Sequence, residues 1–470
     1  MQFITSKLGK ASLNACIDCR YASDVNFDLE RREYIAVDWT SRIISAEDAA
    51  DKVESNNRIF LTANSSTPQV FLSALLNRAS ELQAVEVVKL LDSEATTYIT
   101  PEIAESIRIN NLFIGANARR AVWEGLADFT PVHLSEIPLL FRSRRYLLDV
   151  AVIQVSPPDR HGYCSYGVEV GVTKSAAETA ALVIAEVNPN MPRTLGNSFI
   201  HVNQIDYFIE VDYELPELLP QPANELQQRI ARHIAAYIPD GATLQTGIGG
   251  IPDAVLRQLT GHKDLGIHTE LFSDGVMDMI DAGIITNAKK SIHTGKVVSG
   301  FVLGSRKLFK YIHDNPVFEM HPTEYVNDPF VIAQNDNMYS INSAIEVDIT
   351  GQVCADSIGT RFYSGVGGQL DFVRGASRSN GGMSFIALPS TAKKDTITRI
   401  VPQLKPGAGV TATRYDVRCI ATEYGVANLW GMTIEQRVHA MIDIAHPDFR
   451  DELMAYARAN NYISASSVPV

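Results

Sequence analysis

The sequence predicts an α/β protein of two domains, each built on a mainly parallel sheet. Short apolar runs typical of buried strands alternate with helical segments along the chain, which is the order found in parallel sheets. The length of 470 residues suggests at least two domains. The stretch 211–222 holds three prolines and lacks periodicity, so it is the best linker. We expect an N-terminal extension over 1–40 and α/β domains over 41–220 and 221–470.

The first half begins with a helix signal. Ser45 is followed three residues later by Asp48, a capping pattern that predicts a helix to about Val53. Apolar runs predict strands, and periodic or alanine-rich segments predict helices. The strands are expected at 58–62, 85–88, 111–115 and 148–153, and the helices from Gln69 and over 173–185. The turn-rich segment 156–165 contains His161, which we interpret as turn chemistry.

The second half repeats the α/β pattern. A helix over 224–237 precedes a strand over 242–245 and a glycine-rich turn. Pro252 then occupies the start of a helix, the position that proline tolerates best. Further strands are expected at 296–298, 330–332, 338–348, 383–388 and 418–425, and a helix over 433–443 closes the core.

Composition excludes several classes of protein. The hydrophobic fraction is 46%, and no apolar run approaches the roughly 20 residues of a spanning helix. The net charge of -13 argues against non-specific nucleic-acid binding, although a local site can still hold an anionic small molecule. Five cysteines fit a reducing compartment. Cys16 and Cys19 are spaced as a metal pair, but no second pair exists, so we expect no metal site.

The N-terminal residues decide the expected location. They lack a long apolar core, so we expect no secretory signal and a cytoplasmic protein. Lys7, Lys10 and Arg20 outnumber the single acid Asp18, which leaves an organelle matrix as the alternative. The simplest interpretation is a loosely held extension.

The stretch 264–270 carries the candidate chemistry. A buried strand over 265–269 is expected to end on Glu270, with a helical segment over 271–280 directly after it. A carboxylate at the carboxyl end of a parallel strand points into the crevice where open sheets bind ligands. Glycine-rich turns lie at 247–250 and 365–368. A carboxylate facing glycine-rich backbone suits covalent acyl chemistry, because the carboxylate attacks and N–H groups hold the oxyanion. The alternative is a solvated acid at a strand end.

Several ordered motifs carry a family resemblance. They lie at 247–255, 266–270, 325–329, 341–348, 364–372, 389–392 and 422–427 in the second half, and at 156–162 and 190–194 in the first. Together they resemble the acetyl-CoA hydrolase/transferase family, within the class I coenzyme A transferases. The run Gly-Ile-His-Thr-Glu at 266–270 resembles the 4-hydroxybutyrate and butyrate CoA-transferases most. The resemblance covers about residues 40–462, so the segment before it is a departure.

The resemblance implies a fold and a reaction. It implies two α/β domains with the active site at their interface, and a homodimer. Glu270 would attack an acyl-CoA thioester in a ping-pong reaction and become a glutamyl-CoA thioester, which a second carboxylic acid discharges. Coenzyme A would be a substrate, with no permanently bound cofactor. The partners would be acyl-CoA and carboxylic acid molecules, without nucleic acid or membrane.

The resemblance also assigns roles to other residues. The backbones of Ile248 and Gly368 would supply oxyanion donors, Asn327 a second donor and Glu423 an auxiliary acid. The positions expected to contact CoA are Gly247, Ile248, Gly249, Gly250, Ile251, Ile345, Gly368 and Lys393.

Each assignment has a plain alternative. Asn327 could form the turn before Pro329, and Glu423 could be a helix cap or an ion-pair acid. Ile345 could be an ordinary strand residue and Lys393 a solvated loop lysine. His268 would point to the opposite face from Thr269 because side chains alternate along a strand, so we interpret it as structural.

Three hypotheses therefore remain open on sequence alone. The first is a CoA-transferase acting on a short acyl group and acetate, and the second is a thioester hydrolase on the same scaffold. The third is a CoA- or nucleotide-binding module without catalysis, against which Glu270 and both glycine turns count. A dinucleotide oxidoreductase is a poor fit because the turn at 247–252 lacks the third glycine of that fingerprint. The sequence does not set the acyl chain length or the acceptor.

Overall fold

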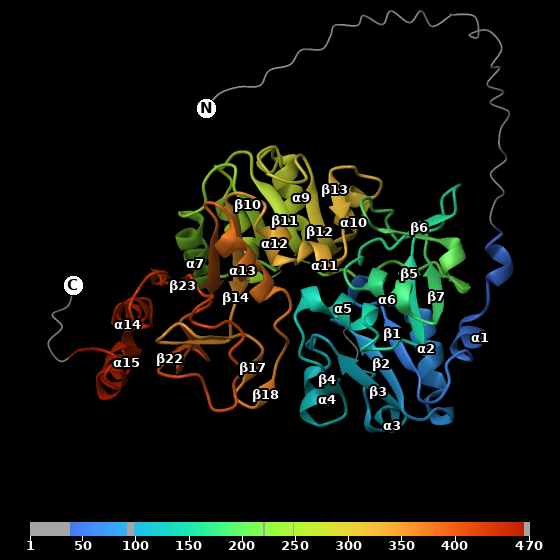
Figure 1. Ribbon diagram of the computed structural model, residues 1–470, viewed down its shortest axis with the longest axis horizontal. Coiled ribbons are helices and arrows are strands. Elements are labelled where there is room, and N and C mark those ends of the chain that lie inside the picture. Colours follow the sequence, from blue (N-terminus) through green and yellow to red (C-terminus); the bar gives the residue numbers. More distant parts are fainter. Residues whose placement is uncertain (1–37, 92–97, 220, 248, 465–470) are drawn as a thin grey trace, which may run out of the picture. The chain divides into compact units, whose positions relative to one another are not determined.

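The computed structural model describes residues 38–91, 98–219, 221–247 and 249–464. These described residues form one compact unit, which contains two large sheets flanked by helices (Figure 1). Cys16 and Cys19 lie outside the described residues, as does most of the predicted extension 1–40. In the described part of the chain, no helix combines the length and apolar composition needed to cross a membrane.

The first sheet has seven parallel strands in the order β4-β3-β2-β1-β5-β7-β9. Its strands are β1 (Arg58–Leu61), β2 (Val85–Lys89), β3 (Ile107–Asn111), β4 (Asp128–Phe129), β5 (Val150–Val155), β7 (Leu182–Val187) and β9 (Tyr207–Glu210). Its helices are α1 (Ala46–Ala50), α2 (Gln69–Asn77), α3 (Pro101–Ala104), α4 (Arg119–Trp123), α5 (Ile137–Arg142) and α6 (Thr173–Thr179). Every residue of β5 is buried, as expected of a central parallel strand covered on both faces.

The second sheet has eight strands in the order β13-β12-β11-β10-β14-β19-β23-β24, and only the last pairing is antiparallel. Its strands are β10 (Thr243–Thr246), β11 (Gly266–Phe272), β12 (Val297–Val302), β13 (Phe318–Met320), β14 (Met338–Ser343), β19 (Met383–Ala387), β23 (Cys419–Thr422) and β24 (Gly425–Asn428). Its helices are α7 (Glu225–Ala235), α8 (Gly250–Gln258), α9 (Asp274–Asp281), α10 (Arg306–Ile312), α11 (Thr323–Val326), α12 (Pro329–Ile332), α13 (Gln369–Arg378), α14 (Ile434–Asp443) and α15 (Pro447–Ala459). The predicted α/β class with mainly parallel sheets is confirmed.

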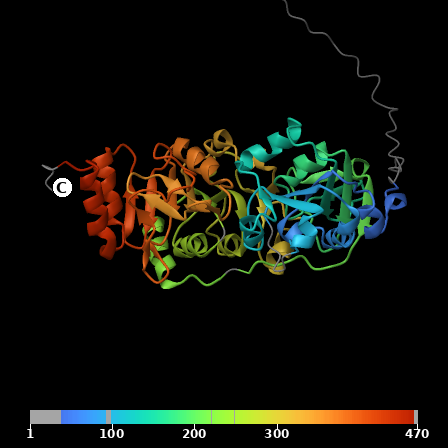
Figure 2. The ribbon, with the colours of Figure 1, turned by 90° about the horizontal axis from the view of Figure 1, so that it is seen from below.

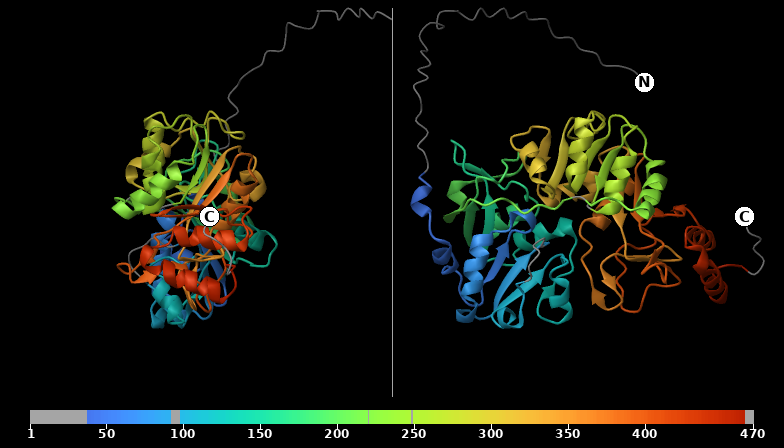
Figure 3. Two further views of the ribbon diagram at one scale, coloured as in Figure 1. Left: turned by 90° about the vertical axis from the view of Figure 1, so that its left-hand side faces the viewer. Right: turned by 180° about the vertical axis from the view of Figure 1, so that it is seen from behind.

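Small ribbons complete the fold. They are β6 (Tyr163–Ser165) with β8 (Phe199–His201), β15 (Glu346–Asp348) with β16 (Val353–Cys354) and β22 (Ile400–Val401), β17 (Ser357–Ile358) with β18 (Arg361–Phe362), and β20 (Thr391–Ala392) with β21 (Ile397–Thr398). Between β9 and α7 the described residues are extended, without helix or strand, and this connection is visible from behind (Figure 3). The domain boundary near residue 220 stays a prediction.

One hydrophobic cluster joins the two sheets. It includes Ile153 from β5 and Phe208 from β9 together with Leu244 from β10 and Phe272 from β11, all fully or nearly fully buried. Because core side chains pack without gaps, this shared cluster packs the second sheet against the first half.

Local signals explain several boundaries. The Ser45 side chain accepts a hydrogen bond from the Asp48 backbone at 2.9 Å, as the capping pattern predicted, although α1 ends at Ala50. At α7, Asn224 and Gln227 exchange two hydrogen bonds of 2.9 Å between side chain and backbone. Such a capping box satisfies N–H groups that a helix start leaves unpaired.

Several predicted elements were wrong. The strand expected at 338–348 is divided into β14 and β15, which belong to different sheets. The helix expected over 271–280 is α9, which begins at Asp274 because β11 continues to Phe272. The strand expected at 111–115 is β3, which ends at Asn111, because its buried side chains begin earlier, at Ile107. The helix expected over 173–185 ends at Thr179, and the apolar run that follows is β7. The strand expected at 330–332 is helix α12, where the Asp328 side chain caps the Phe330 backbone at 2.8 Å and Pro329 begins the helix, both helix-start signals.

The sequence interpretation also missed the last helix. Helix α15 begins at Pro447 and runs for 13 residues, beyond the helix that was expected to close the core. It packs beside α14, and the two are drawn in red at the C-terminal end (Figure 2). Its buried residues, Leu453 and Ala457, are few, so its apolar periodicity was faint.

A glycine sets the packing of α12 on α13. A Cβ built at Gly375 would lie 2.4 Å from Cγ2 of Ile332, which is fully buried. Alanine is the better helix former by about 1 kcal/mol, but overpacking costs about 1–3 kcal/mol. Gly375→Ala should therefore lower the free energy of unfolding, measured by urea denaturation. Ile332→Ala in the same chain should relieve the clash, so the double variant should lose less than the sum. A more stable Gly375→Ala would contradict this packing.

Candidate active site

Glu270 lies within β11 and not after its end, which corrects the predicted strand boundary. The strand continues to Phe272 because β12 continues beside it, pairing Leu271 with Phe301. The neighbouring strand β10 stops at Thr246, whose carbonyl accepts a hydrogen bond from the Thr269 hydroxyl at 3.1 Å. Glu270 therefore projects beyond the carboxyl end of β10, the edge where parallel sheets place ligands.

Two donors hold the Glu270 carboxylate. The Asn327 side-chain amide donates to Oε2 at 2.9 Å, and the backbone N–H of Gly368 also donates to the carboxylate. Asn327 follows α11 directly and is fully buried. A Cβ built at Gly368 would lie 1.9 Å from Oε2 of Glu270 and 2.1 Å from Nδ2 of Asn327. Only glycine fits there, because the space is already taken by the two functional side chains.

The charge state of Glu270 reflects two opposing effects. Burial raises the pKa of this carboxyl above its usual range, since the charged form loses hydration. The hydrogen bonds from Asn327 and Gly368 lower the pKa, because both stabilise the charged form. The side chain keeps partial exposure. The group is thus less hydrated than a surface acid, and its charged form is stabilised by two hydrogen-bond donors.

The first half holds the glycine turn that carries Gly368. The Leu134 N–H donates to the Gly367 carbonyl at 3.1 Å. The Ser135 hydroxyl donates to Asp371 at 2.9 Å and its backbone N–H at 3.3 Å. Burial and the charge of Glu270 together raise the pKa of Asp371 to about 7. Residues of the first half therefore position the backbone donor at Gly368, which belongs to the second half.

A cavity opens beside Glu270. Its lining residues are Leu90, Leu91, Phe113, Leu134, Gly247, Glu270, Leu271, Phe301 and Gly367, around a cavity of about 180 Å³. Both halves of the chain contribute, and Glu270 is the one charged side chain among these residues. The cavity is consequently an apolar chamber with a carboxylate at its wall.

The first glycine turn reaches the cavity at Gly247. Ile248, predicted as an oxyanion donor and CoA contact, lies outside the described residues. Gly249 is exposed with a φ of 117° and precedes α8. A Cβ at Gly250 would lie 2.2 Å from the Gln227 amide, and Ile251 is buried. At Gly250 the backbone therefore lies against the Gln227 side chain, whereas a Cβ built at Gly249 would have no neighbour within 4 Å.

Three other predicted site residues, all within the described part of the chain, have no hydrogen bond to Glu270. Glu423 is buried and accepts hydrogen bonds from the Ser390 backbone at 2.9 Å and hydroxyl at 2.6 Å, which fits neither a helix cap nor an ion pair. Ile345 is half-buried between β14 and β15, and Lys393 is exposed in a left-handed turn with a φ of 49°. Across the described ranges, no hydrogen bond links these three side chains to Glu270.

His268 is fully buried and supports α11. Its Nε2 lies 2.8 Å from the Val326 carbonyl, and burial lowers its pKa to about 3. It thus stays neutral and braces the residue before Asn327, in agreement with a structural interpretation. The cavity wall formed by Leu90, Phe113 and Leu134 was not anticipated, because isolated apolar residues carry no signal of their own.

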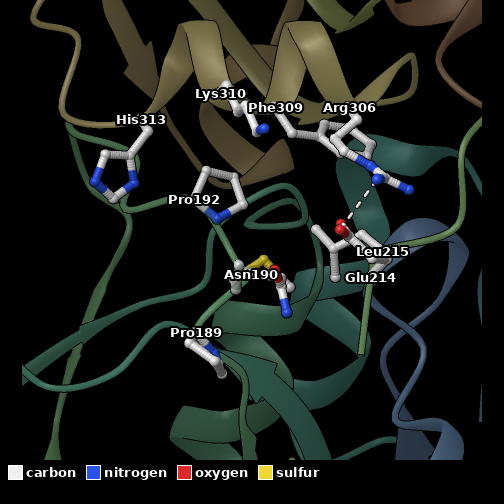
Figure 4. Close-up of a pocket in the computed structure, with 10 residues that line it drawn as sticks. Pro189, Asn190, Pro192, Glu214, Leu215, Arg306, Phe309, Lys310 and His313 are labelled. Atoms are coloured by element: carbon white, nitrogen blue, oxygen red, sulfur yellow. Dashed lines mark ion pairs between the residues drawn. The ribbon is translucent and has the colours of Figure 1, made fainter. Parts of the chain in front are cut away.

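Two other features lie apart from Glu270. Among the described residues, the atoms of His293, Glu319 and His321 lie close enough to hold a metal ion. Within this group, His293 is hydrogen-bonded to Glu319 at 2.5 Å and to Tyr325 at 2.6 Å, and Nε2 of His321 has no described hydrogen-bond partner. A separate pocket lies against α10 (Figure 4). Its lining includes the cations Arg306 and Lys310, and Arg306 is paired with Glu214 at 3.0 Å. No predicted site residue lines this pocket.

Comparisons with known proteins match both halves of the chain. Residues 27–219 match the model of the acetyl-CoA hydrolase/transferase N-terminal domain, and residues 304–457 match that of the C-terminal domain. A 4-hydroxybutyrate coenzyme A transferase of Clostridium kluyveri is 48% identical over 88% of this chain and 97% of its own. A succinyl-CoA:acetate/propanoyl-CoA:succinate CoA transferase of Fasciola hepatica is 46% identical over 84% and 83%.

A solved structure extends the likeness to the fold. The crystal structure of a 4-hydroxybutyrate CoA-transferase from Porphyromonas gingivalis superposes with a TM-score of 0.75 and 42% identity. The match covers 90% of this chain and 98% of that one. The sequence matches and the structural match therefore both cover the two sheets.

The Asp371 contact has a consequence for stability. Its folded pKa of about 7 exceeds the ordinary 3.8, so the unfolded state releases its proton first. The stability that this group contributes is present below about pH 4 and is lost as the pH rises to about 7. Asp371→Asn should therefore gain melting temperature relative to the unaltered protein between about pH 5 and pH 8. Asp416→Asn is the control, because the pKa of Asp416 is lowered. The difference in melting temperature between this variant and the unaltered protein should stay constant over the same pH range. A constant difference for Asp371→Asn would contradict the assignment.

Proposed function

This chain belongs to the acetyl-CoA hydrolase/transferase family and is a coenzyme A transferase, and on that premise we propose that it moves CoA between a short-chain acyl-CoA and acetate through Glu270. The observation that carries the proposal is a carboxylate held by Asn327 and Gly368 at the wall of an apolar cavity. Nucleophilic carboxylates of this kind divide one difficult transfer into two easier steps.

The first half-reaction needs neither ATP nor a proton. A Glu270 oxygen attacks the thioester carbonyl, the C–S bond breaks, and CoA leaves as a thiolate. The resulting mixed anhydride joins the acyl group to Glu270. The thiolate then attacks the Glu270 carbonyl carbon, the acid leaves as a carboxylate, and a glutamyl-CoA thioester remains. The second acid reverses these steps, so charge and atoms balance throughout.

The donors on Glu270 suit both attacks. Asn327 holds Oε2 at 2.9 Å, which leaves Oε1 as the attacking oxygen. When the thiolate attacks the Glu270 carbonyl, the oxygen held by Asn327 becomes the oxyanion. Preorganised donors aimed at a developing charge are the largest catalytic term in many enzymes, and one is worth about 10²–10³ in kcat. We assign Ile248 as a further backbone donor on the family resemblance.

The CoA site is proposed along the first glycine turn. Gly247 lines the cavity beside Glu270, and the turn leads into α8. Residues 247–251, Ile345 and Lys393 are proposed CoA contacts, with Glu423 as an auxiliary acid. A homodimer and the lack of a permanently bound cofactor are proposed on the same resemblance. A cytoplasmic location, with an organelle matrix as the alternative, is a separate proposal.

The cavity favours an uncharged acyl chain. Its described walls hold no cation that could pair with a second carboxylate. The neighbouring residues 92–97 lie outside the described part, but their sequence contains no lysine or arginine. Burying an unpaired carboxylate is costly. Butyryl or 4-hydroxybutyryl groups therefore suit the cavity better than a succinyl group.

Acyl-CoA selectivity tests the cavity. We expect kcat/KM for butyryl-CoA to exceed that for succinyl-CoA by about 100-fold. The cause is the cost of burying the second carboxylate of the succinyl group without a partner, and a cost of about 2.7 kcal/mol corresponds to that ratio. Leu91→Arg should narrow the ratio by pairing with the second carboxylate. Leu139→Arg, on an exposed position of α5 that is 62% accessible, is the matched control and should leave it unchanged. Equal use of both thioesters by the unaltered enzyme would refute the apolar assignment.

Covalent trapping tests the mechanism itself. Incubation with acyl-CoA and no acceptor should leave CoA on Glu270, and borohydride should then reduce that thioester to an alcohol. Inactivation should require acyl-CoA, and the peptide containing Glu270 should carry the mass change. Acetate should protect by discharging the intermediate, and Glu270→Gln should show no modification.

The other hypotheses give different outcomes. A hydrolase would discharge the thioester to water without any acceptor, so free CoA would accumulate during trapping. A binding module would show neither inactivation nor a modified peptide. Confirmed turnover without any acyl-CoA-dependent change at Glu270 would overturn the ping-pong route.

A further inference from the structure

A second buried carboxyl belongs to a loop that packs against the strands around the reactive one. Glu169 belongs to the loop between β6 and α6 and is 2% exposed. Its backbone forms an isolated antiparallel bridge with Phe301, which lines the cavity. The next residues, Val170 and Gly171, both donate backbone hydrogen bonds to Gly300. Gly300 in turn packs against Glu270, because a Cβ built there would lie 3.1 Å from the Glu270 carbonyl. The loop that carries Glu169 thus packs against the ends of β11 and β12 near Glu270.

Glu169 has little support as an anion. Oε2 accepts one long bond, 3.4 Å from the Asn64 side-chain amide. Oε1 is enclosed without a hydrogen-bond partner among the described residues. It packs so closely against Gly171 that a Cβ there would lie 2.7 Å away. A buried carboxylate without donors costs far more than the neutral acid, so the surroundings favour the protonated form.

The two carboxyls differ in how well they hold a charge. Glu270 accepts bonds from Asn327 at 2.9 Å and from the Gly368 backbone, whereas Glu169 has the single long bond from Asn64. Around Glu169, the elements packed against it bring Asn64, Thr323 and Phe301, which are uncharged. Within the described chain, Glu270 is the one titratable group whose charge acts on it. Coupled acids titrate as a pair, so the first negative charge settles on Glu270.

Resting on the function proposed above, we propose that Glu169 is a positioning residue that stays a neutral acid, lets Glu270 carry the single negative charge of the pair, and stops the transfer when it ionises. The lost proton goes to solvent. Ionised Glu169 would place a second negative charge beside the oxyanion that forms at Glu270. Burial and the charge of Glu270 raise the pKa of Glu169 to about 8, which places the effect at mildly alkaline pH.

The test compares pH profiles of matched variants. Glu169→Gln keeps the neutral shape and removes the ionisation. Glu186→Gln is the control, because Glu186 is also fully buried and burial raises its pKa to about 7. Glu186 accepts bonds from the Tyr213 hydroxyl at 2.5 Å and the Phe71 backbone at 2.7 Å, and the charge of Glu270 does not contribute to its pKa shift. The readout is kcat/KM with butyryl-CoA and acetate, with each profile scaled to its own value at about pH 7.

The expected result is a lost alkaline limb in one variant only. The unaltered enzyme and Glu186→Gln should fall up to about tenfold per pH unit above about pH 8, and Glu169→Gln should stay flat. An unchanged alkaline limb in Glu169→Gln would overturn the proposal. A second outcome would also overturn the proposal: Glu169→Gln melts at the same temperature as the unaltered protein at about pH 5 but has no activity at any pH. The amide preserves the shape of the neutral acid, so the proposal requires this variant to be active.

Melting temperatures separate this proposal from the function on which it rests. The folded pKa of Glu169 lies above its ordinary 4.5, so its stabilising contribution is lost as the pH rises from about 4.5 to about 8. Glu169→Gln should therefore gain melting temperature relative to the unaltered protein over that range, whatever the enzyme transfers. A parallel pH dependence would refute the neutral acid. Absence of turnover with every acyl-CoA, beside the expected melting shift, would refute the transferase assignment alone.

Discussion

The site depends on the missing side chain at Gly368. Oε2 of Glu270 and Nδ2 of Asn327 both lie about 2 Å from the point that a Cβ would occupy. The backbone N–H can reach the carboxylate only because that space is free. The φ of Gly368 is -92°, which any residue adopts, so the requirement is one of room and not of backbone conformation. Any larger residue would separate the carboxylate from both donors at once.

This constraint connects the two sheets. Gly368 precedes α13 in the second half, but Leu134 and Ser135 of the first half bind its turn through Gly367 and Asp371. The same turn closes one side of the apolar cavity, and Phe113 packs against it within 3.3 Å of a Cβ built at Gly367. Nucleophile, donor and acyl chamber therefore share one set of contacts, which makes relative movement of the halves costly for the chemistry.

Much of this arrangement could be predicted from the sequence, and the reasons are physical. Glu270, Gly368 and Asn327 stand in compact motifs whose residue types have few other uses, and the structure brings all three together. The parallel strands were visible as apolar runs. The strand holding Glu270 was drawn too short, because its extension depends on pairing with β12, a contact between distant residues. Helix α12 was taken for a strand since its apolar run is too short to show a period.

What sequence could not supply is the meeting of isolated side chains. Leu90, Phe113 and Leu134 come from separate loops of the first half and form a wall only in the folded chain. Glu169 and Asp371 gain their raised pKa values from burial and from Glu270, and neither effect is visible in a linear motif. Lys393 and Ile345 remain proposals as CoA contacts and Glu423 as an auxiliary acid, because each role is defined by a bound substrate.

The most direct measurement follows oxygen atoms through the nucleophile. Turnover of acyl-CoA with acetate labelled with oxygen-18 should move label into the Glu270 side chain. An oxygen of the labelled acetate becomes the bridge of the mixed anhydride. That oxygen stays on the glutamyl group when the CoA thiolate takes the acetyl carbon and leaves as acetyl-CoA. Peptide mass spectrometry should find the label on the peptide containing Glu270 and on no other. Sustained transfer with an unlabelled Glu270 peptide would contradict a covalent route through this residue.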